Sequence, residues 1–163
     1  MTLESNFNGD LKREQQLAPL IDNYYSTCLN QYTFKRIHDR KNQFAGIDVV
    51  FEHKTNGSSY AVDEKAQLDY INEDLPTFAF EISYKKGGVF KKGWLFNTAK
   101  KTEFYSLITA IYTDEPNVFT SCKITLVNRL KLLAFLDDRK VTAERLKTYV
   151  KNSNTIHGKL KLK

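Results

Sequence analysis

Two aspartates and a lysine lie on two strand-like segments that are separated by an Asn-Gly dipeptide. Asp48 belongs to the first segment, and Asp63 and Lys65 belong to the second. Two carboxylates brought close together can hold one Mg²⁺ ion, which takes oxygen ligands and keeps several of its waters. A nearby lysine can orient or deprotonate a metal-bound water, or stabilise charge on a phosphate. These residue types therefore predict metal-assisted hydrolysis of a phosphate ester.

The element that must position these side chains is a β-hairpin around residues 56–57. Asn-Gly between two alternating segments is a strong signal for a two-residue turn. That turn places Asp48 opposite Lys65 and makes Asp48 and Asp63 diagonal neighbours, about 7 Å apart, on one face. Glu64 points to the other face, but its backbone carbonyl remains available to a metal ion.

A third predicted strand, residues 78–84, adds another acid. Its alternation places three apolar side chains on one face and Glu81 on the other. If this strand pairs beside the hairpin in register, Glu81 lies on the same side of the sheet as Asp48. We therefore include Glu81 among the candidate catalytic residues.

The remaining pattern predicts one α/β or α+β layered domain over residues 1–163. Apolar residues at helical spacing indicate a helix over residues 10–32, which Pro19 could kink or divide. The polar, basic stretch 34–44 is expected to cross the surface as a connection. The predicted strands are residues 47–52, 59–65, 78–84, 93–96, 104–112, 121–127 and 155–162, and the later helices are residues 129–137 and 143–151.

Gly46-Ile47-Asp48 on one strand and Asp63-Glu64-Lys65 on the next resemble the PD-(D/E)XK nuclease superfamily. That family pairs an acid on one strand with an acid-any-lysine motif on the following strand. Ile47 stands where the family name has proline, as in many members. The resemblance covers residues 10–96 and implies a restriction-endonuclease-like fold, a mixed β-sheet flanked by helices. It also implies site roles for Gln67, two residues after the lysine, and for Glu14 on the preceding helix.

The charge balance favours a polyanionic partner. The chain has 25 lysines and arginines against 19 aspartates and glutamates, which gives a net charge of +6. Lysines cluster in the middle of the chain and at residues 159–163, around an acidic centre, which suits a site for a metal ion and an anionic substrate. Solubility is the alternative role for any single lysine. The lysines expected to contact phosphates are Lys85, Lys86, Lys91 and Lys92, with Lys100 and Lys101 in the same cluster.

Length and composition exclude several other classes of protein. With 163 residues, 41 % of them apolar and 13 % aromatic, the chain fits a folded domain rather than a disordered or fibrous protein. No apolar stretch approaches about twenty residues, and residues 1–6 lack the pattern of a secretory signal, so we expect a cytoplasmic protein without a membrane span. Cys28 and Cys122 are expected to be buried thiols, and the scattered histidines predict no zinc site.

The sequence thus predicts a Mg²⁺-dependent nuclease that hydrolyses phosphodiester bonds in DNA, with Mn²⁺ able to substitute. Asp48, Asp63 and the Glu64 carbonyl would hold the metal ion, and Lys65 would position the attacking water and stabilise the transition state. The alternatives are a non-catalytic nucleic-acid-binding module of the same fold, or a protein-interaction or assembly factor. The alternative structural role for Asp48, Asp63 and Lys65 is a solvated salt-bridge ladder on an exposed face. Residues 39–43 resemble short phage-type or plasmid-type members, and a homo-oligomer is compatible with the sequence.

Overall fold

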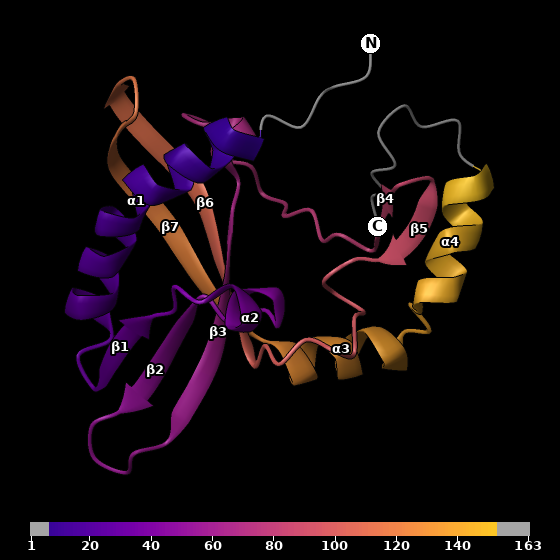
Figure 1. Cartoon of the computed structure of the whole chain (residues 1–163), viewed down its shortest axis with the longest axis horizontal. Coiled ribbons are helices and arrows are strands. Elements are labelled where there is room, and N and C mark those ends of the chain that lie inside the picture. Colours follow the sequence, from indigo (N-terminus) through magenta and orange to yellow (C-terminus); the bar gives the residue numbers. More distant parts are fainter. Residues whose placement is uncertain (1–6, 153–163) are drawn as a thin grey trace.

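A computed structural model describes residues 7–152 of the chain (Figure 1). They form a mixed α+β fold in which five strands make one sheet in the order β1-β2-β3-β6-β7, and β4 pairs with β5 in a small second sheet. Neighbouring strands are antiparallel except β3 and β6, which run parallel. The elements are α1 (Phe7–Cys28), β1 (Tyr32–Arg36), α2 (Arg40–Phe44), β2 (Val49–His53), β3 (Ser59–Ala66), the 3-10 helix η1 (Leu68–Tyr70), β4 (Ser83–Lys86), β5 (Val89–Lys92), β6 (Phe104–Glu115), β7 (Val118–Asn128), α3 (Arg129–Asp138) and α4 (Ala143–Asn152).

Helix α1 covers one face of the large sheet with an apolar stripe. Leu17, Ile21 and Tyr25 recur at four-residue intervals, so their side chains share one side of the helix, and all three are buried. Pro19 lies inside α1 on its exposed side, and the predicted helix continues through it as one element. The strand residues that pack against this stripe are Val49, Phe51, Val62, Ile108 and Ile111.

The opposite face of the sheet is covered by α3 and by the irregular segment that joins β3 to β6. Buried Leu95, Tyr105 and Leu107 form the centre of this second core. Asn128 caps α3, since its side chain accepts a hydrogen bond from the Lys131 N–H at 3.0 Å. The partly buried residues around the second core are Phe78, Phe80, Trp94, Phe96, Val127, Leu132, Leu133 and Leu136.

The β2–β3 hairpin forms as predicted, but its loop is longer. The His53 N–H donates to the Ser58 carbonyl at 2.8 Å, so residues 54–57 make the loop. Asn56 supports it by accepting from the Ser58 N–H at 2.9 Å. The pairing therefore shifts by two residues, and Asp48 lies opposite Asp63 rather than opposite Lys65. A shift of two leaves every side chain on its predicted face, because strand side chains alternate with period two.

Two segments differ from the expectation drawn from the sequence. Residues 34–44 are not a plain connection: they hold most of β1 and the whole of α2, because alternate side chains of β1 pack on the core under α1. Residues 78–84 do not add a strand to the large sheet, and residues 93–96 lie outside the strands. Gly93 instead lies against the Glu81 backbone, where a Cβ atom would come within 2.3 Å of the Glu81 carbonyl oxygen.

The other predicted elements are confirmed within a few residues. Strands β6 and β7 and helices α3 and α4 cover the segments assigned to them, and β6 and β7 extend further into a long hairpin. The predicted strand 155–162 lies outside the described residues. Among the described helices, none has the length and apolar character needed to cross a membrane.

Both cysteines are free thiols, but only one is buried to any extent. Cys28 is exposed because it ends α1 beyond the buried stripe, which corrects the prediction for this residue. Cys122 on β7 is half-buried, and burial raises the pKa of its thiol to about 11. At neutral pH the Cys122 thiol is therefore protonated and a poor nucleophile.

Candidate functional site

The structure brings Asp48, Asp63 and Lys65 together on one face of the sheet. Asp48 directly precedes β2, and its backbone N–H donates to the Val62 carbonyl at 2.9 Å, which sets it opposite Asp63. Two residues further along β3, the Lys65 ammonium forms an ion pair with the Asp63 carboxylate. The Asp63 side chain is only 3 % exposed, whereas that of Lys65 is 26 % exposed. Solvent therefore reaches the lysine more readily than the acid it bonds.

The two carboxyl groups disturb each other electrostatically. The pKa of Asp48 is raised to about 7, first by burial and then by the negative charge of Asp63, while Lys65 acts in the opposite direction. The Glu64 N–H also stabilises the charged form by donating to Asp48 Oδ2 at 2.9 Å. One lysine thus offsets only part of the charge that two carboxylates place on this face.

One oxygen of the pair lacks a hydrogen-bond partner. Asp63 Oδ2 is buried, and none of the residues described in the structure donates to it. Gly46 lies close by, since a Cβ built on it would be 3.4 Å from this oxygen and 2.3 Å from Thr102 Oγ1. The Thr102 hydroxyl instead donates to the Gly46 carbonyl at 2.8 Å. A buried acceptor without a donor is costly, and the donor that the protein itself can offer is the Asp48 carboxyl in its protonated form, an interaction that also raises the pKa of Asp48.

The donor set fits a divalent cation with oxygen ligands. A cation between Asp48 and Asp63 would satisfy Asp63 Oδ2, relieve the repulsion between the carboxylates and lower the pKa of Asp48. Within residues 7–152, no group of three or more His, Cys, Asp or Glu side chains could hold a metal ion. The protein ligands would therefore be the two aspartates and a backbone carbonyl such as that of Glu64, with water in the other positions.

An aromatic wall holds Lys65 in place. Its Nζ atom lies 5.3 Å from the centre of the Trp94 ring, a cation–π contact. Trp94 packs edge-to-face on Tyr105 at 4.9 Å, and the Tyr105 hydroxyl accepts from Arg129 Nε at 3.0 Å. Trp94 is thus packed against the second core, with its ring facing the lysine.

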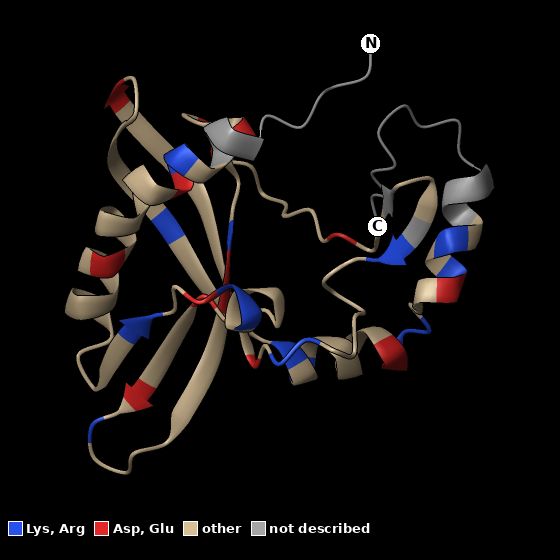
Figure 2. Ribbon diagram, in the orientation of Figure 1, with Lys and Arg blue, Asp and Glu red and all other residues tan. Residues whose placement is uncertain are grey.

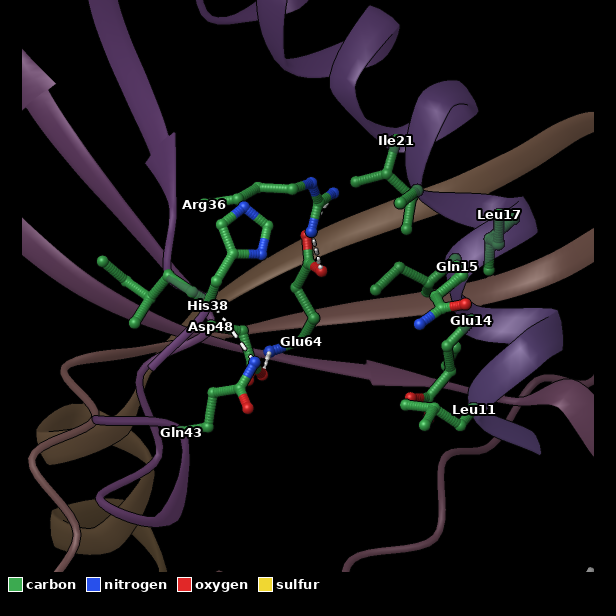
Figure 3. A pocket seen from close by; sticks show the side chains of 14 residues that line it. Leu11, Glu14, Gln15, Leu17, Ile21, Arg36, His38, Gln43, Asp48 and Glu64 are labelled. Atoms are coloured by element: carbon green, nitrogen blue, oxygen red, sulfur yellow. Dashed lines mark hydrogen bonds and ion pairs between the residues drawn. The ribbon is translucent and has the colours of Figure 1, made fainter. Parts of the chain in front are cut away.

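A cavity of about 250 Å³ opens between α1 and the sheet beside this site (Figure 3). Asp48 lines it, whereas Asp63 and Lys65 do not. Glu14, suggested by the family resemblance, lines the same cavity from α1, and so does Gln43 from α2. Of Asp48, Asp63 and Lys65, Asp48 is therefore the residue that a molecule in the cavity would contact.

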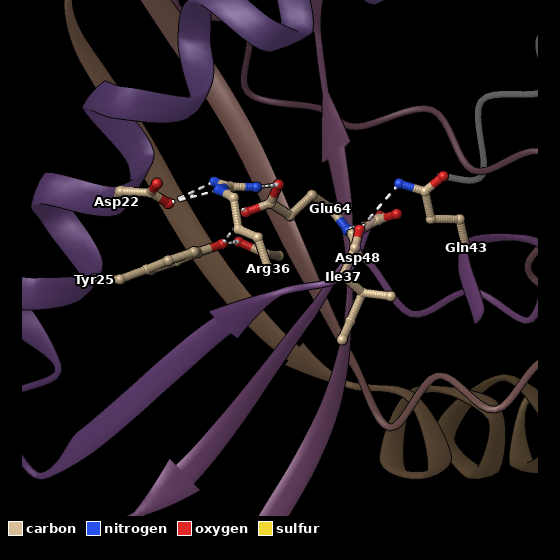
Figure 4. Close-up of polar contacts among 8 residues, drawn as sticks. Asp22, Tyr25, Arg36, Ile37, Gln43, Asp48 and Glu64 are labelled. Carbon is tan, nitrogen blue, oxygen red and sulfur yellow. Dashed lines mark hydrogen bonds and ion pairs between the residues drawn. The ribbon is translucent and has the colours of Figure 1, made fainter. Parts of the chain in front are cut away.

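Glu64 belongs to a separate polar network on the α1 face (Figure 4). Its carboxylate accepts from Arg36 Nη1 at 2.8 Å, and Arg36 also bonds Asp22 at 2.7 Å. The Tyr25 hydroxyl lies 2.8 Å from Glu64 Oε1 and 2.7 Å from Ser106 Oγ. Burial and the Glu64 charge raise the pKa of Tyr25, and although burial alone would lower the pKa of Arg36, hydrogen bonds to the two acids raise it. This network was not predicted, because Arg36 was assigned to a connection; the alternating pattern of residues 32–36 is the signal that could have revealed it.

The remaining candidates lie in other surroundings. Gln67 Nε2 donates to the Thr77 carbonyl at 2.9 Å, so this side chain fastens the segment after β3. Glu81 is exposed in an irregular segment, so the register argument that placed it beside Asp48 is wrong. Lys91 and Lys92 are exposed on β5 (Figure 2), and Lys85 and Lys86 lie on β4 of the same small sheet.

Comparison with known proteins adds no relative from which a function could be transferred. No protein-family model, no curated protein and no solved structure matches the chain. The functional argument therefore depends on the geometry of the Asp48–Asp63–Lys65 site and on the chemistry of its groups.

Proposed function

We propose that the protein is a metal-dependent nuclease that hydrolyses phosphodiester bonds in DNA. The observation that carries this proposal is the buried, unpartnered Oδ2 atom of Asp63 beside Asp48, whose pKa is raised. Perturbed carboxylates of this kind are typical of functional sites, and a divalent cation is the natural counterion for two of them. Lys65 adds a positive charge, partly exposed, on the same face.

Each residue of the site has a distinct role in this proposal. Asp48 and Asp63 would hold Mg²⁺ or Mn²⁺, with the Glu64 carbonyl as a further protein ligand. When bound, such an ion supplies Lewis-acid polarisation of a phosphate oxygen and a lowered pKa for a bound water. Lys65, fixed between the Asp63 carboxylate and the Trp94 ring, stabilises the negative charge that develops on the phosphate as the P–O bond breaks.

We further propose that the fold is restriction-endonuclease-like. The order of α1, β1, β2 and β3 follows the helix–strand–strand–strand order of that family, with the short helix α2 inserted between β1 and β2. The sheet is mixed, and helices α1 and α3 cover its opposite faces. Asp48 directly precedes β2 and the acid-any-lysine motif lies on β3, in line with the acid on one strand and the motif on the following strand that the family carries.

A second function is favoured by one specific observation. Among the described residues, no third acidic side chain joins Asp48 and Asp63 in a metal-holding group. This suits a nucleic-acid-binding module of the same fold that does not cleave. The lysines of β4 and β5 would contact phosphates in either case, and the choice of DNA and a cytoplasmic location remain predictions.

Cleavage assays separate the two functions. Linear and circular DNA are incubated with the protein in Mg²⁺, Mn²⁺ or EDTA, and new ends are sought. We expect ends with either metal ion and none in EDTA, with both Asp48→Ala and Asp63→Ala inactive. Asp74→Ala is the matched control, because Asp74 is an exposed aspartate paired with Lys123 away from the site. No cleavage under any condition, with DNA binding unaffected by EDTA, would favour the binding module.

A further inference from the structure

We infer that α2 and residues 97–102 form a surface for single-stranded nucleic acid, on which Phe44 stacks against an unpaired base. The inference rests on the proposed function, because it places a polyanionic substrate beside Asp48 and Asp63. It goes further in naming the form of the substrate and the residues that hold it. Four cations lie in or next to this segment: Arg40 and Lys41 belong to α2, and Lys100 and Lys101 donate to the backbone carbonyls of Phe44 and Ala45.

The Phe44 ring is presented to solvent by a rigid support. Its exposed fraction is 78 %, and α2 contains no buried residue, so the ring does not anchor the helix. Polar contacts hold α2 instead. Asp39 caps it by accepting from the Asn42 N–H at 3.0 Å, and the Ile47 N–H donates to the Asn42 carbonyl at 3.0 Å. An exposed aromatic on a fixed backbone loses little freedom when a base stacks on it.

Basic residues from two distant parts of the chain meet at the Phe44 segment. Arg40 and Lys41 precede Phe44 by four and three residues, so all three lie on one side of α2. Lys100 Nζ donates to the Phe44 carbonyl at 2.8 Å, and the Lys101 N–H donates to the Ala45 carbonyl at 2.7 Å. Figure 2 shows the positive residues of α2 in the centre of the molecule. Arg40 and Lys41 therefore lie on the same side of α2 as Phe44, and the Lys100 ammonium lies at the C-terminal end of the helix.

The same segment leads directly into the carboxylate site. Gly46 follows Phe44 by two residues, and it lies against Thr102 and the unpartnered oxygen of Asp63. The loop that supplies Lys100 and Lys101 is therefore fixed to the backbone beside the site. A strand whose phosphates lie on these cations would pass the edge at which Asp48 and Asp63 meet.

The combination of ring and cations selects a single strand over a duplex. Lysine and arginine contact phosphates in both forms and carry no preference by themselves. A phenyl ring gains affinity only from a base whose face is free, as it is in a single strand, a gap or a frayed end. In an intact duplex Phe44 would remain unstacked.

Binding measured in EDTA tests the inference without cleavage. A fluorescent single-stranded oligonucleotide and the matching duplex are titrated, and anisotropy gives the affinities. We expect Phe44→Ala to weaken single-strand binding by about 5- to 100-fold, as for loss of one stacked base, with duplex affinity little changed. Phe44→Trp should retain the single-strand affinity. Phe135→Ala is the control, because Phe135 is also an exposed ring beside a cation, with Arg139 3.6 Å from its centre.

The salt dependence tests the cations separately. Lys41→Ala and Lys100→Ala should each reduce the slope of log affinity against log salt by about 0.7 for a single strand. Lys54→Ala is the control. Lys54 lies on the β2–β3 loop and, like Lys100, is a lysine whose Nζ donates to a backbone carbonyl, in this case that of Asn30. Unchanged slopes in the first two variants would remove α2 from the binding surface.

The outcomes also separate this inference from the proposed nuclease function. If single-strand binding depends on Phe44 but the protein does not cleave DNA, the inference is supported and only the proposed nuclease activity is refuted. Normal cleavage together with unchanged single-strand affinity in Phe44→Ala overturns the inference alone. Equal loss of single-strand and duplex binding in Phe44→Ala overturns it too. A change from dimer to monomer in sedimentation of this variant, with unchanged nucleic-acid affinity, would instead identify Phe44 as a self-association contact and also overturns the inference.

Discussion

Asp63 and Glu64 are adjacent acids on β3 with opposite surroundings. Glu64 faces α1, where Arg36 donates two hydrogen bonds to it and the Tyr25 hydroxyl lies within 2.8 Å. Asp63 faces the other side, where Lys65 pairs with it and also acts on the charge of the nearby Asp48. Among residues 7–152, no group donates to the second oxygen of the Asp63 carboxylate. An acid whose charge and hydrogen bonds are matched by the protein, as in Glu64, stabilises the fold. An acid without such partners, as in Asp63, can gain them by binding a cation.

Asp63 and Glu64 have different surroundings because they lie on opposite faces of the same strand. Alternation sends neighbouring side chains to opposite sides of the sheet, so each acid meets a different set of elements. Buried charges are tolerated when they are paired and fully hydrogen-bonded, which the planar fork of Arg36 achieves for Glu64. Proteins depart from this rule mainly at functional sites, and the Asp48–Asp63 pair is such a departure.

Removing the lysine of the unbalanced site should have the largest effect. Lys65→Ala is expected to lower the cleavage rate on the order of 10²-fold or more, because a positioned charge for the transition state is lost. Mg²⁺ affinity should stay the same or rise, since a positive neighbour of the ligands is gone. Cleavage and Mg²⁺ titration of one sample measure both. Glu64→Gln is the control and should retain most activity, because its backbone N–H still serves Asp48.

Two other results would change the role given to Lys65. Joint loss of metal binding and activity would show that it supports the ligands rather than the transition state. Unchanged activity, with a stability loss of about 0.2–1 kcal/mol, would instead indicate the simple salt bridge.

The pH dependence of stability should reveal the carboxylate pair in the metal-free protein. The pKa of Asp48 is about 7 in the folded protein, above its ordinary value, so the folded state binds the extra proton between about pH 4 and 7. This contribution to stability is complete below the unfolded pKa and is lost as the pH rises to 7. One pKa unit corresponds to about 1.4 kcal/mol, so the loss is on the order of a few kcal/mol.

Asp48→Asn isolates that contribution, because asparagine cannot ionise. Urea unfolding in EDTA should show the variant gaining stability relative to the wild type as the pH rises from about 4 to 7. Parallel pH profiles for the two proteins would contradict the raised pKa of Asp48, which burial and the charge of Asp63 cause together.

Neutralising the two adjacent acids of β3 should act in opposite directions. Glu64→Gln is expected to lower the free energy of unfolding by about 2 kcal/mol, because Arg36 loses a partly buried partner while keeping Asp22. Asp63→Asn should leave stability unchanged or raise it, since relief of the repulsion with Asp48 outweighs the loss of the ion pair with the partly exposed Lys65. Urea unfolding at pH 7 in EDTA measures both. If Asp63→Asn were the more destabilising change, the contrast between the faces would be refuted.

The smallest effect is expected from the hydroxyl of Tyr25. Tyr25→Phe removes one group that lies within hydrogen-bond distance of both Glu64 and Ser106, at a cost of about 1 kcal/mol in the free energy of unfolding. Tyr24→Phe, on the neighbouring position of α1, is the control. Equal stability of the two variants would mean that Arg36 alone balances Glu64.

The shared face of the three site residues could be predicted from the local sequence pattern, but the elements that lie beside them could not. Alternation puts Asp48, Asp63 and Lys65 on one face, and this survives the change in loop length because the register moves by two. The loop length itself depends on contacts of His53 and Asn56 with the loop backbone, which a two-residue turn rule does not include. Glu81 was misplaced for a longer-range reason: β3 pairs in parallel with β6 rather than with the segment that follows it.

The sequence by itself determined the α1 stripe, the hairpin, the later strands and helices, and the shared face of two acids and a lysine. These follow from helical and strand periodicity, which act over a few residues. Only the tertiary structure decided that Arg36 would balance Glu64, that Trp94 would hold Lys65, and that Phe44 would stand exposed among cations. Such contacts join elements far apart in the chain, and they form because burial on two faces of one sheet fixes which elements meet.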